Sequence, residues 1–317
     1  MGEIGGVPPK KEEGTMKEGR RGNLSPGAWS DFFRTDLACE GGAPIAEIQE
    51  ERAVAGGSPV ILTRRTETGG GASVTLSCGR LTARGEAGLE PLGELLAEEL
   101  RRLAAAMTGR EAGADLRVLA VGLGNGAMTP DAVGPQTLRR LTVTRHLRAY
   151  DEALFASLGC CELSALSPGV MGQTGMETGE VVRAAVELTR PHLLVAVDAL
   201  AARSCDRLAS TIQLSDSGIS PGAGIGNHRM ALTRETMGCP VMGVGVPTVV
   251  DSATLVLDAL GRAGMLAEDG DLPAPLAEVL EQGRSFIVTP RDCDEMVSVT
   301  CRLLARGLNL AFGVADL

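Results

Sequence analysis

Apolar residues follow two alternating patterns along this chain. Short apolar runs at Arg117–Gly122, Leu193–Val197 and Val241–Val246 predict buried parallel strands, and Thr211–Leu214 predicts another short strand. Leucines at helical spacing, ending in a methionine, predict an amphipathic helix over residues 89–107. Further helices are predicted over residues 134–145, 178–190, 228–236, 251–264 and 292–310. Because strands alternate with helices, we expect a doubly wound α/β fold with a mostly parallel sheet.

The N-terminal part lacks this alternation. Residues 1 to about 30 are rich in Gly, Glu, Lys and Pro without periodicity, which predicts a mobile extension, and order is expected to begin near Trp29–Phe33. The segments Pro59–Thr63 and Ala72–Ser77 lie between glycine clusters and predict two strands of a small additional β region, around residues 45–85.

Composition removes several kinds of chemistry from the body of the chain. All three lysines, Lys10, Lys11 and Lys17, lie near the N-terminus, so a phosphate-loop lysine, a Schiff base and a Ser-Lys dyad are not expected in the fold. His146, His192 and His228 are the only histidines, so a three-histidine metal site would need all of them.

Charge and cysteine content limit the kinds of partner and the cellular compartment that we expect. The net charge of −10 falls entirely beyond residue 36, and aromatic residues make up only 2% of the chain, so we expect no direct nucleic-acid binding. The eight cysteines form no Cys-x-x-Cys pair, and we see neither a secretory segment nor an apolar run able to span a bilayer. A reduced, cytoplasmic protein without membrane contact is expected.

Two carboxylates stand where apolar strands are expected to end in loops. Asp131 follows the strand at Arg117–Gly122, and Asp198 follows Leu193–Val197. In an open α/β sheet, reacting groups gather at the carboxyl ends of the strands, so the pair suggests acid–base chemistry or metal ligation. A cap near a helix N-terminus is an equal alternative for Asp131.

A glycine-rich turn lies between the first strand and Asp131. Gly122 and Gly124 resemble the start of a dinucleotide fingerprint, but Ala127 stands where the third glycine belongs. The turn leaves a non-enzymatic phosphate-binding module as a weaker alternative.

Several long motifs together resemble the spore germination protease family. They occur in order and cover nearly everything from about residue 33 onward, which makes them more specific than one glycine turn; they are Gly122–Pro135, Ser164–Gly179, Val197–Arg203, Ser215–His228 and Pro240–Asp251. The resemblance implies an endopeptidase that degrades small acid-soluble spore proteins, which bind DNA, during germination in the spore core. It also implies an inactive zymogen, a homotetramer, no required cofactor and a phosphorylase/hydrolase-like core similar to the hydrogenase maturation peptidases.

The same resemblance suggests roles for particular residues. The two aspartates to which the family mechanism is ascribed correspond to Asp131 and Asp198. In the hydrogenase-maturation relatives the equivalent carboxylates recognise a metal, so a peptidase dyad, a metal clamp and a purely structural pair all remain open. Asn125, Asp216 and His228 are candidate supporting or substrate-binding residues, although helix capping is the commoner use of an aspartate such as Asp216 or Asp251.

The segment Arg34–Glu40 looks like an internal copy of the family's substrate sequence. An acidic residue precedes the cut and an apolar residue follows it, so the expected self-cleavage site is the bond between Asp36 and Leu37. The expected organisation is therefore a propeptide over residues 1–36 and a single α/β peptidase domain over residues 37–317. Cys239 precedes a proline without a nearby base, so we expect it to pack rather than to act as a nucleophile.

Overall fold

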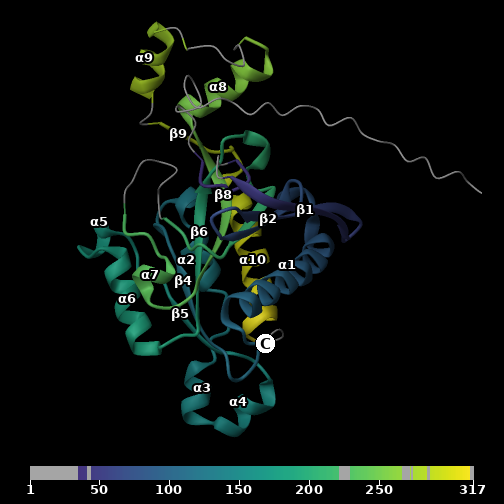
Figure 1. Ribbon diagram of the computed structural model, residues 1–317, viewed down its shortest axis with the longest axis vertical. Coiled ribbons are helices and arrows are strands. Elements are labelled where there is room, and N and C mark those ends of the chain that lie inside the picture. Colours follow the sequence, from purple (N-terminus) through teal and green to yellow (C-terminus); the bar gives the residue numbers. More distant parts are fainter. Residues whose placement is uncertain are drawn as a thin grey trace, which may run out of the picture.

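One mixed sheet organises the computed structural model, which describes residues 35–40, 44–220, 229–265, 272, 274–283 and 286–314. The strand order is β1-β2-β3-β7-β8-β6-β4-β5, and β9 pairs with β8 (Figure 1). The strands are β1 Ile45–Ala55, β2 Ser58–Glu67, β3 Ala72–Ser77, β4 Arg117–Gly122, β5 Glu162–Leu166, β6 Leu193–Ala201, β7 Thr211–Ser215, β8 Val241–Asp251 and β9 Ile287–Val288.

The sheet has a parallel half and an antiparallel half. Strands β5, β4, β6 and β8 run parallel, whereas β7, β3, β2 and β1 each pair antiparallel with their neighbour. The expectation of a mostly parallel sheet is therefore wrong for β7 and the strands beyond it. The predicted strands at Pro59–Thr63 and Ala72–Ser77 are confirmed as β2 and β3, and they extend the main sheet.

Helices cover both faces of the sheet. On one face α1 packs against α10, and α2 lies between α10 and the strands β4 and β6 (Figure 1). On the other face α6 contacts β4 and β5, and α7 contacts α6. The helices are α1 Gly85–Thr108, α2 Val133–Leu138, α3 Arg145–Tyr150, α4 Glu152–Leu158, α5 Met171–Thr174, α6 Thr178–Thr189, α7 Arg234–Met237, α8 Ser252–Arg262, α9 Ala274–Gly283 and α10 Cys293–Phe312. None of the described helices is long and apolar enough to cross a membrane.

The central strands supply apolar side chains to two separate cores. In β6, Val195 and Val197 join the core beneath α1 and α10, whereas Leu194 and Ala196 join the core beneath α6. Because side chains alternate along a strand, Asp198 lies on the same face as Leu194 and Ala196. This alternation decides which side of the sheet carries the candidate site.

Most of the predicted helices are confirmed, and two are partly wrong. Of the predicted helix 228–236, residue 228 lies outside the described residues, and the described part is helical only from Arg234. Leu232 pairs with Ile219 in an isolated bridge, and the capping box of Thr233 starts the helix there. The segment 134–145 is helical only as far as Leu138, and the next helix, α3, begins at Arg145. Between them, the Thr144 hydroxyl donates to the carbonyl of Cys161 and accepts from the N–H of Leu163 at the edge of β5. The predicted N-terminal extension lies outside the described residues.

Candidate active site

The first carboxylate, Asp131, is fixed by the loop that follows β4. It ends a short 3₁₀ turn, Thr129–Asp131, and its Oδ2 accepts a hydrogen bond from the backbone N–H of Asn125 at 2.7 Å. The carbonyl of the neighbouring Pro130 accepts a hydrogen bond from the Thr248 hydroxyl of β8 at 2.7 Å. The first contact fixes the carboxylate within its own loop, and the second ties that loop to the sheet through β8.

The second carboxylate, Asp198, lies inside a strand and not after one. Strand β6 continues to Ala201 because its residues keep pairing with β8, and Asp198 itself pairs with Gly245. The strand β4 has already ended beside it, since the last β4 residue, Gly122, pairs with Val197. The side chain of Asp198 is buried, and its Oδ1 accepts from the N–H of Ala199 at 2.9 Å.

Asp131 and Asp198 line one cavity of ≈ 390 Å³. The side chain of Asp198 lies on the face of the sheet that α6 covers. Arg229 also lines the cavity, as do Asn125 and Asp36. The predicted pair is therefore brought together, and Asn125 contributes its backbone to holding Asp131. Sequence reasoning missed Arg229, although it directly follows His228 in one of the quoted motifs.

Burial, together with the charge of Asp131 acting on Asp198, sets the pKa values of the two carboxyl groups apart. Desolvation, followed by the charge of Asp131, holds the pKa of Asp198 well above its usual range. Desolvation also raises the pKa of Asp131, while the Asn125 hydrogen bond and the charge of Arg229 oppose this rise. The arrangement favours a proton on Asp198 and an ionised Asp131, which is the division of states that general acid–base chemistry requires.

The predicted cleavage segment lies against the same cavity. The Asp36 backbone N–H donates to the carbonyl of Ala201 at 2.9 Å, and the Asp36 Oδ2 accepts from the N–H of Ala201 at 2.8 Å. Asp36 is also close enough to Asp198 for its charge to raise the pKa of that carboxyl. The end of β6 thus brings the segment to the carboxylate pair.

Two further residues dock the segment after Asp36. Leu37 is 1% exposed and packs against Leu200 and Ala202. The carboxylate of Glu40 forms an ion pair with Arg207 at 3.1 Å and accepts from the N–H of Arg203 at 2.7 Å. Sequence reasoning included Glu40 in the segment without anticipating this partner, which is contributed by a distant loop.

None of the other predicted residues contributes a described side chain to this cavity. Asp216 holds the start of β3, because its Oδ1 accepts from the N–H of Ala72 at 2.6 Å, and it does not line the cavity. His228 lies outside the described residues. Asp251 is confirmed as the N-cap of α8, and Cys239 is buried in the core beneath α6.

The structure also gives observations on the two alternative kinds of site, a metal clamp and a phosphate-binding turn. Among the residues described here, no group of three or more His, Cys, Asp or Glu side chains is arranged to hold a metal ion. In the glycine turn, the N–H of Asn125 already donates to the carboxylate of Asp131. A phosphate bound there would have to compete with a negative group, so the turn is poorly suited to phosphate.

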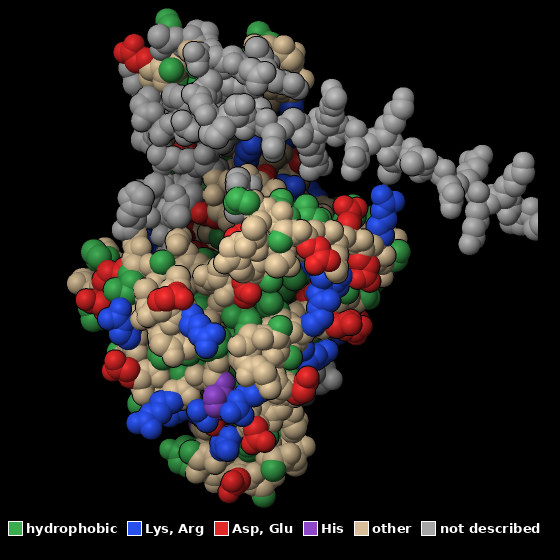
Figure 2. Space-filling model, in the orientation of Figure 1, with side chains coloured by type: hydrophobic (Ala, Val, Ile, Leu, Met, Phe, Trp, Pro, Cys, Tyr) green, Lys and Arg blue, Asp and Glu red, His purple; other side chains and the backbone are tan. Residues whose placement is uncertain are grey.

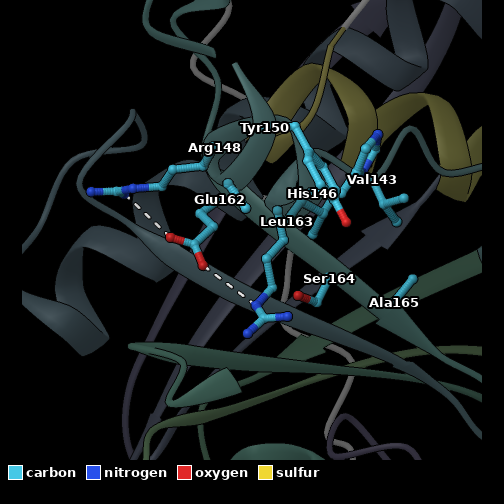
Figure 3. Close-up of a pocket in the computed structure, with 10 residues that line it drawn as sticks. Val143, His146, Arg148, Tyr150, Glu162, Leu163, Ser164 and Ala165 are labelled. Carbon is cyan, nitrogen blue, oxygen red and sulfur yellow. Dashed lines mark ion pairs between the residues drawn. The ribbon is translucent and has the colours of Figure 1, made fainter. Parts of the chain in front are cut away.

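A second cavity of ≈ 570 Å³ lies along the edge of β5 (Figure 3). Its single carboxylate, Glu162, pairs with Arg148 at 3.2 Å and Arg145 at 3.6 Å, as the dashed lines in Figure 3 show. Because its lining contains one carboxylate, and that one pairs with two arginines, this cavity has no counterpart of the Asp131–Asp198 pair. On the face in Figure 2, acidic and basic side chains of the described residues are intermixed and form no continuous basic surface.

Comparison with known proteins shows the family to which the chain belongs. An open α/β sheet that buries two coupled carboxylates beside a docked chain segment is suited to hydrolysis of a peptide bond. The germination protease family model matches residues 63–263, so the chain belongs to the germination protease family.

Individual relatives extend the match. The chain is 37% identical over 259 residues to the germination protease of Clostridium acetobutylicum, an alignment that covers 76% of this chain and 78% of that protein. It is 39% identical over 215 residues to the germination protease of Caldanaerobacter subterraneus, covering 62% and 66% respectively. The corresponding protease of Halalkalibacterium halodurans is 39% identical over 246 residues.

Proposed function

We propose that this protein is an endopeptidase, made as a self-processing zymogen, that hydrolyses small acid-soluble spore proteins in the spore core during germination. The observation that carries the proposal is the position of Asp36, which lines the same cavity as Asp131 and Asp198. The homotetramer that the family resemblance implies belongs to this proposal.

Asp131 and Asp198 divide the chemistry in the proposed mechanism. The ionised Asp131 takes a proton from a water molecule, whose oxygen forms a bond to the carbonyl carbon of the substrate. The protonated Asp198 supplies a proton during collapse of the intermediate, in which the carbon–nitrogen bond breaks and the nitrogen leaves as a neutral amine. The raised pKa of Asp198 supports this division, because its proton persists where ordinary aspartates are ionised.

Arg229 favours substrates with an acidic residue before the cut. The cavity already contains two carboxylates and receives a third from Asp36. The positive charge of Arg229, which lines the cavity, offsets the repulsion between these carboxylates and an acidic substrate side chain. The same argument explains how an acidic internal segment docks at an acidic site.

Cleavage of a purified small acid-soluble spore protein tests the proposal directly. We expect cleavage by the self-processed wild type and none by Asp131→Asn, whereas Asp115→Asn, an exposed change, cleaves normally. Cleavage should persist in the presence of a chelator. A metal-recognising peptidase would instead lose activity with the chelator and show calorimetric heat with nickel that Asp131→Asn abolishes. Cleavage by folded Asp131→Asn would contradict the acid–base pair.

A further inference from the structure

Gln213 lies in the same row of the sheet as Asp198. Both residues pair with Gly245 of β8, Asp198 from β6 and Gln213 from β7. In the same strand as Gln213, Ile212 and Leu214 point into the core beneath α1 and α10, so Gln213 points to the opposite face, where Asp198 lies. Gln213 is 8% exposed, an unusual environment for an amide side chain.

The Gln213 amide contacts the docked segment on both sides of Leu37. Its Oε1 accepts a hydrogen bond from the N–H of Ala38 at 2.6 Å. Its Nε2 donates to the carbonyl oxygen of Asp36 at 3.4 Å, which is the carbonyl of the bond expected to be cut. The Gln213 side chain therefore binds the main chain on both sides of Leu37, the residue that follows the expected cut.

Two further hydrogen bonds fix the main chain of the segment, one from β2 and one within the segment itself. Arg65 of β2 donates to the carbonyl of Ala38 at 2.7 Å, and the N–H of Leu37 donates to the hydroxyl of Thr35 at 3.1 Å. Because the contacts of Gln213 are to backbone atoms, they do not depend on which side chains the bound segment carries. Any peptide whose main chain follows the path of residues 36–38 would offer the same atoms.

We propose that Gln213 is a substrate-positioning residue, whose amide holds the main chain of the bound peptide across the residue after the cut and donates to the carbonyl oxygen being attacked. The inference rests on the proposed function. Negative charge develops on that oxygen during attack, so the long contact in the docked segment is expected to tighten as the bond is cleaved. Glutamine fits this role because its amide both donates and accepts.

The test compares self-cleavage rates of full-length chains by intact mass. Gln213→Met keeps the length of the side chain and removes both hydrogen bonds, so cleavage is expected to slow by about 100-fold, the usual cost of losing a donor to the developing oxyanion. The control Gln49→Met changes an exposed glutamine of β1 and should cleave at the wild-type rate. Thermal unfolding of each variant establishes that it is folded.

Gln213→Glu provides a readout that a structural role would not move. When protonated, the new carboxyl can accept from Ala38 and donate to the Asp36 carbonyl, but when ionised it can only accept. We therefore expect the ratio of its rate to the wild-type rate to rise at least tenfold as pH falls through the pKa of the new carboxyl. The titratable or charged groups that face this position are the same in both chains, so their effects largely cancel in the ratio; they are Asp36, Cys39, Glu40, Arg65, Asp198 and Arg207.

The outcomes separate the inference from the proposed function. A ratio for Gln213→Glu that is flat with pH, or wild-type cleavage by folded Gln213→Met, would overturn the role of Gln213 and leave the peptidase standing. A wild-type chain that never self-cleaves under any of the conditions would overturn the proposed function and this inference with it.

Discussion

Gly124 lies directly against Asp131. A Cβ atom added to Gly124 would stand 2.1 Å from the carbonyl oxygen of Asp131 and 2.8 Å from its Oδ1, and Gly124 has a φ of +103°. No side chain fits there without moving the loop that carries Asp131, so the glycine is required for the position of the carboxylate.

The change Gly124→Ala should therefore reduce activity at least 100-fold, because small misplacement of a reacting group is costly. Gly126→Ala is a matched control two residues along the same loop. Its added Cβ would meet the Pro135 side chain at an ordinary 3.5 Å, so near-normal kcat/KM is expected. Equal kcat/KM values for the two variants would show that the loop does not need the close approach.

Asp198→Asn should stabilise the fold at neutral pH. A carboxyl whose pKa is raised by folding binds its proton more tightly in the folded state, so stability falls as pH rises from its ordinary pKa of 3.8 toward the raised value. Asparagine removes this penalty. We expect a gain in unfolding free energy on the order of 1 kcal/mol or more at pH 7, since one pKa unit corresponds to about 1.4 kcal/mol.

Urea denaturation at several pH values checks the expected stability change. The gain from Asp198→Asn should be small near pH 4 and grow with rising pH until Asp198 ionises in the folded wild type. A gain independent of pH, or a loss at pH 7, would show that the Asp198 proton is not held as described.

The rate of substrate cleavage should follow a bell-shaped pH profile. On the acid side, the rate falls when Asp131 takes up a proton and can no longer act as a base. On the alkaline side, it falls when Asp198 loses the proton that its burial and the charge of Asp131 preserve. Initial rates of self-processed enzyme over the range in which it remains folded measure the profile, and a rate that is level throughout would contradict a shared proton.

Leu37→Ala should slow self-cleavage by weakening the docked segment. Leu37 is 1% exposed against Leu200 and Ala202, and truncating a buried leucine commonly costs about 2–5 kcal/mol. We expect at least a tenfold slower loss of the propeptide by intact mass. Leu188→Ala, a change at a leucine that is 72% exposed on α6, is the control and should process normally.

The sequence predicted the elements that owe their stability to burial. Strands β4 and β6 and helices α1 and α10 carry apolar residues at the matching period, and each was found near its predicted position. Strand β1 was missed because nearly all of its residues are exposed. Its pairing with β2 depends on backbone hydrogen bonds and cross-strand contacts such as Glu51 with Arg64 at 2.8 Å, which apolar periodicity does not report.

The direction of β7 was predictable from a signal that was overlooked. Thr211, Gln213 and Ser215 alternate with Ile212 and Leu214, and such alternation is more typical of antiparallel strands. That Asp131 and Asp198 would lie at one site could be predicted, because each belongs to a long motif. The partners of Asp36 and Glu40 could not, because Ala201, Gln213 and Arg207 lie more than 160 residues away and only the folded sheet brings them to the segment.

The intact mass of the full-length protein over time at mildly acidic pH tests the central claim most directly. Wild type and the exposed control Asp115→Asn should both lose the segment ending at Asp36, whereas Asp198→Asn should keep its full mass while remaining folded. Loss of that segment from Asp198→Asn at the wild-type rate would contradict a peptidase that depends on the buried aspartate pair.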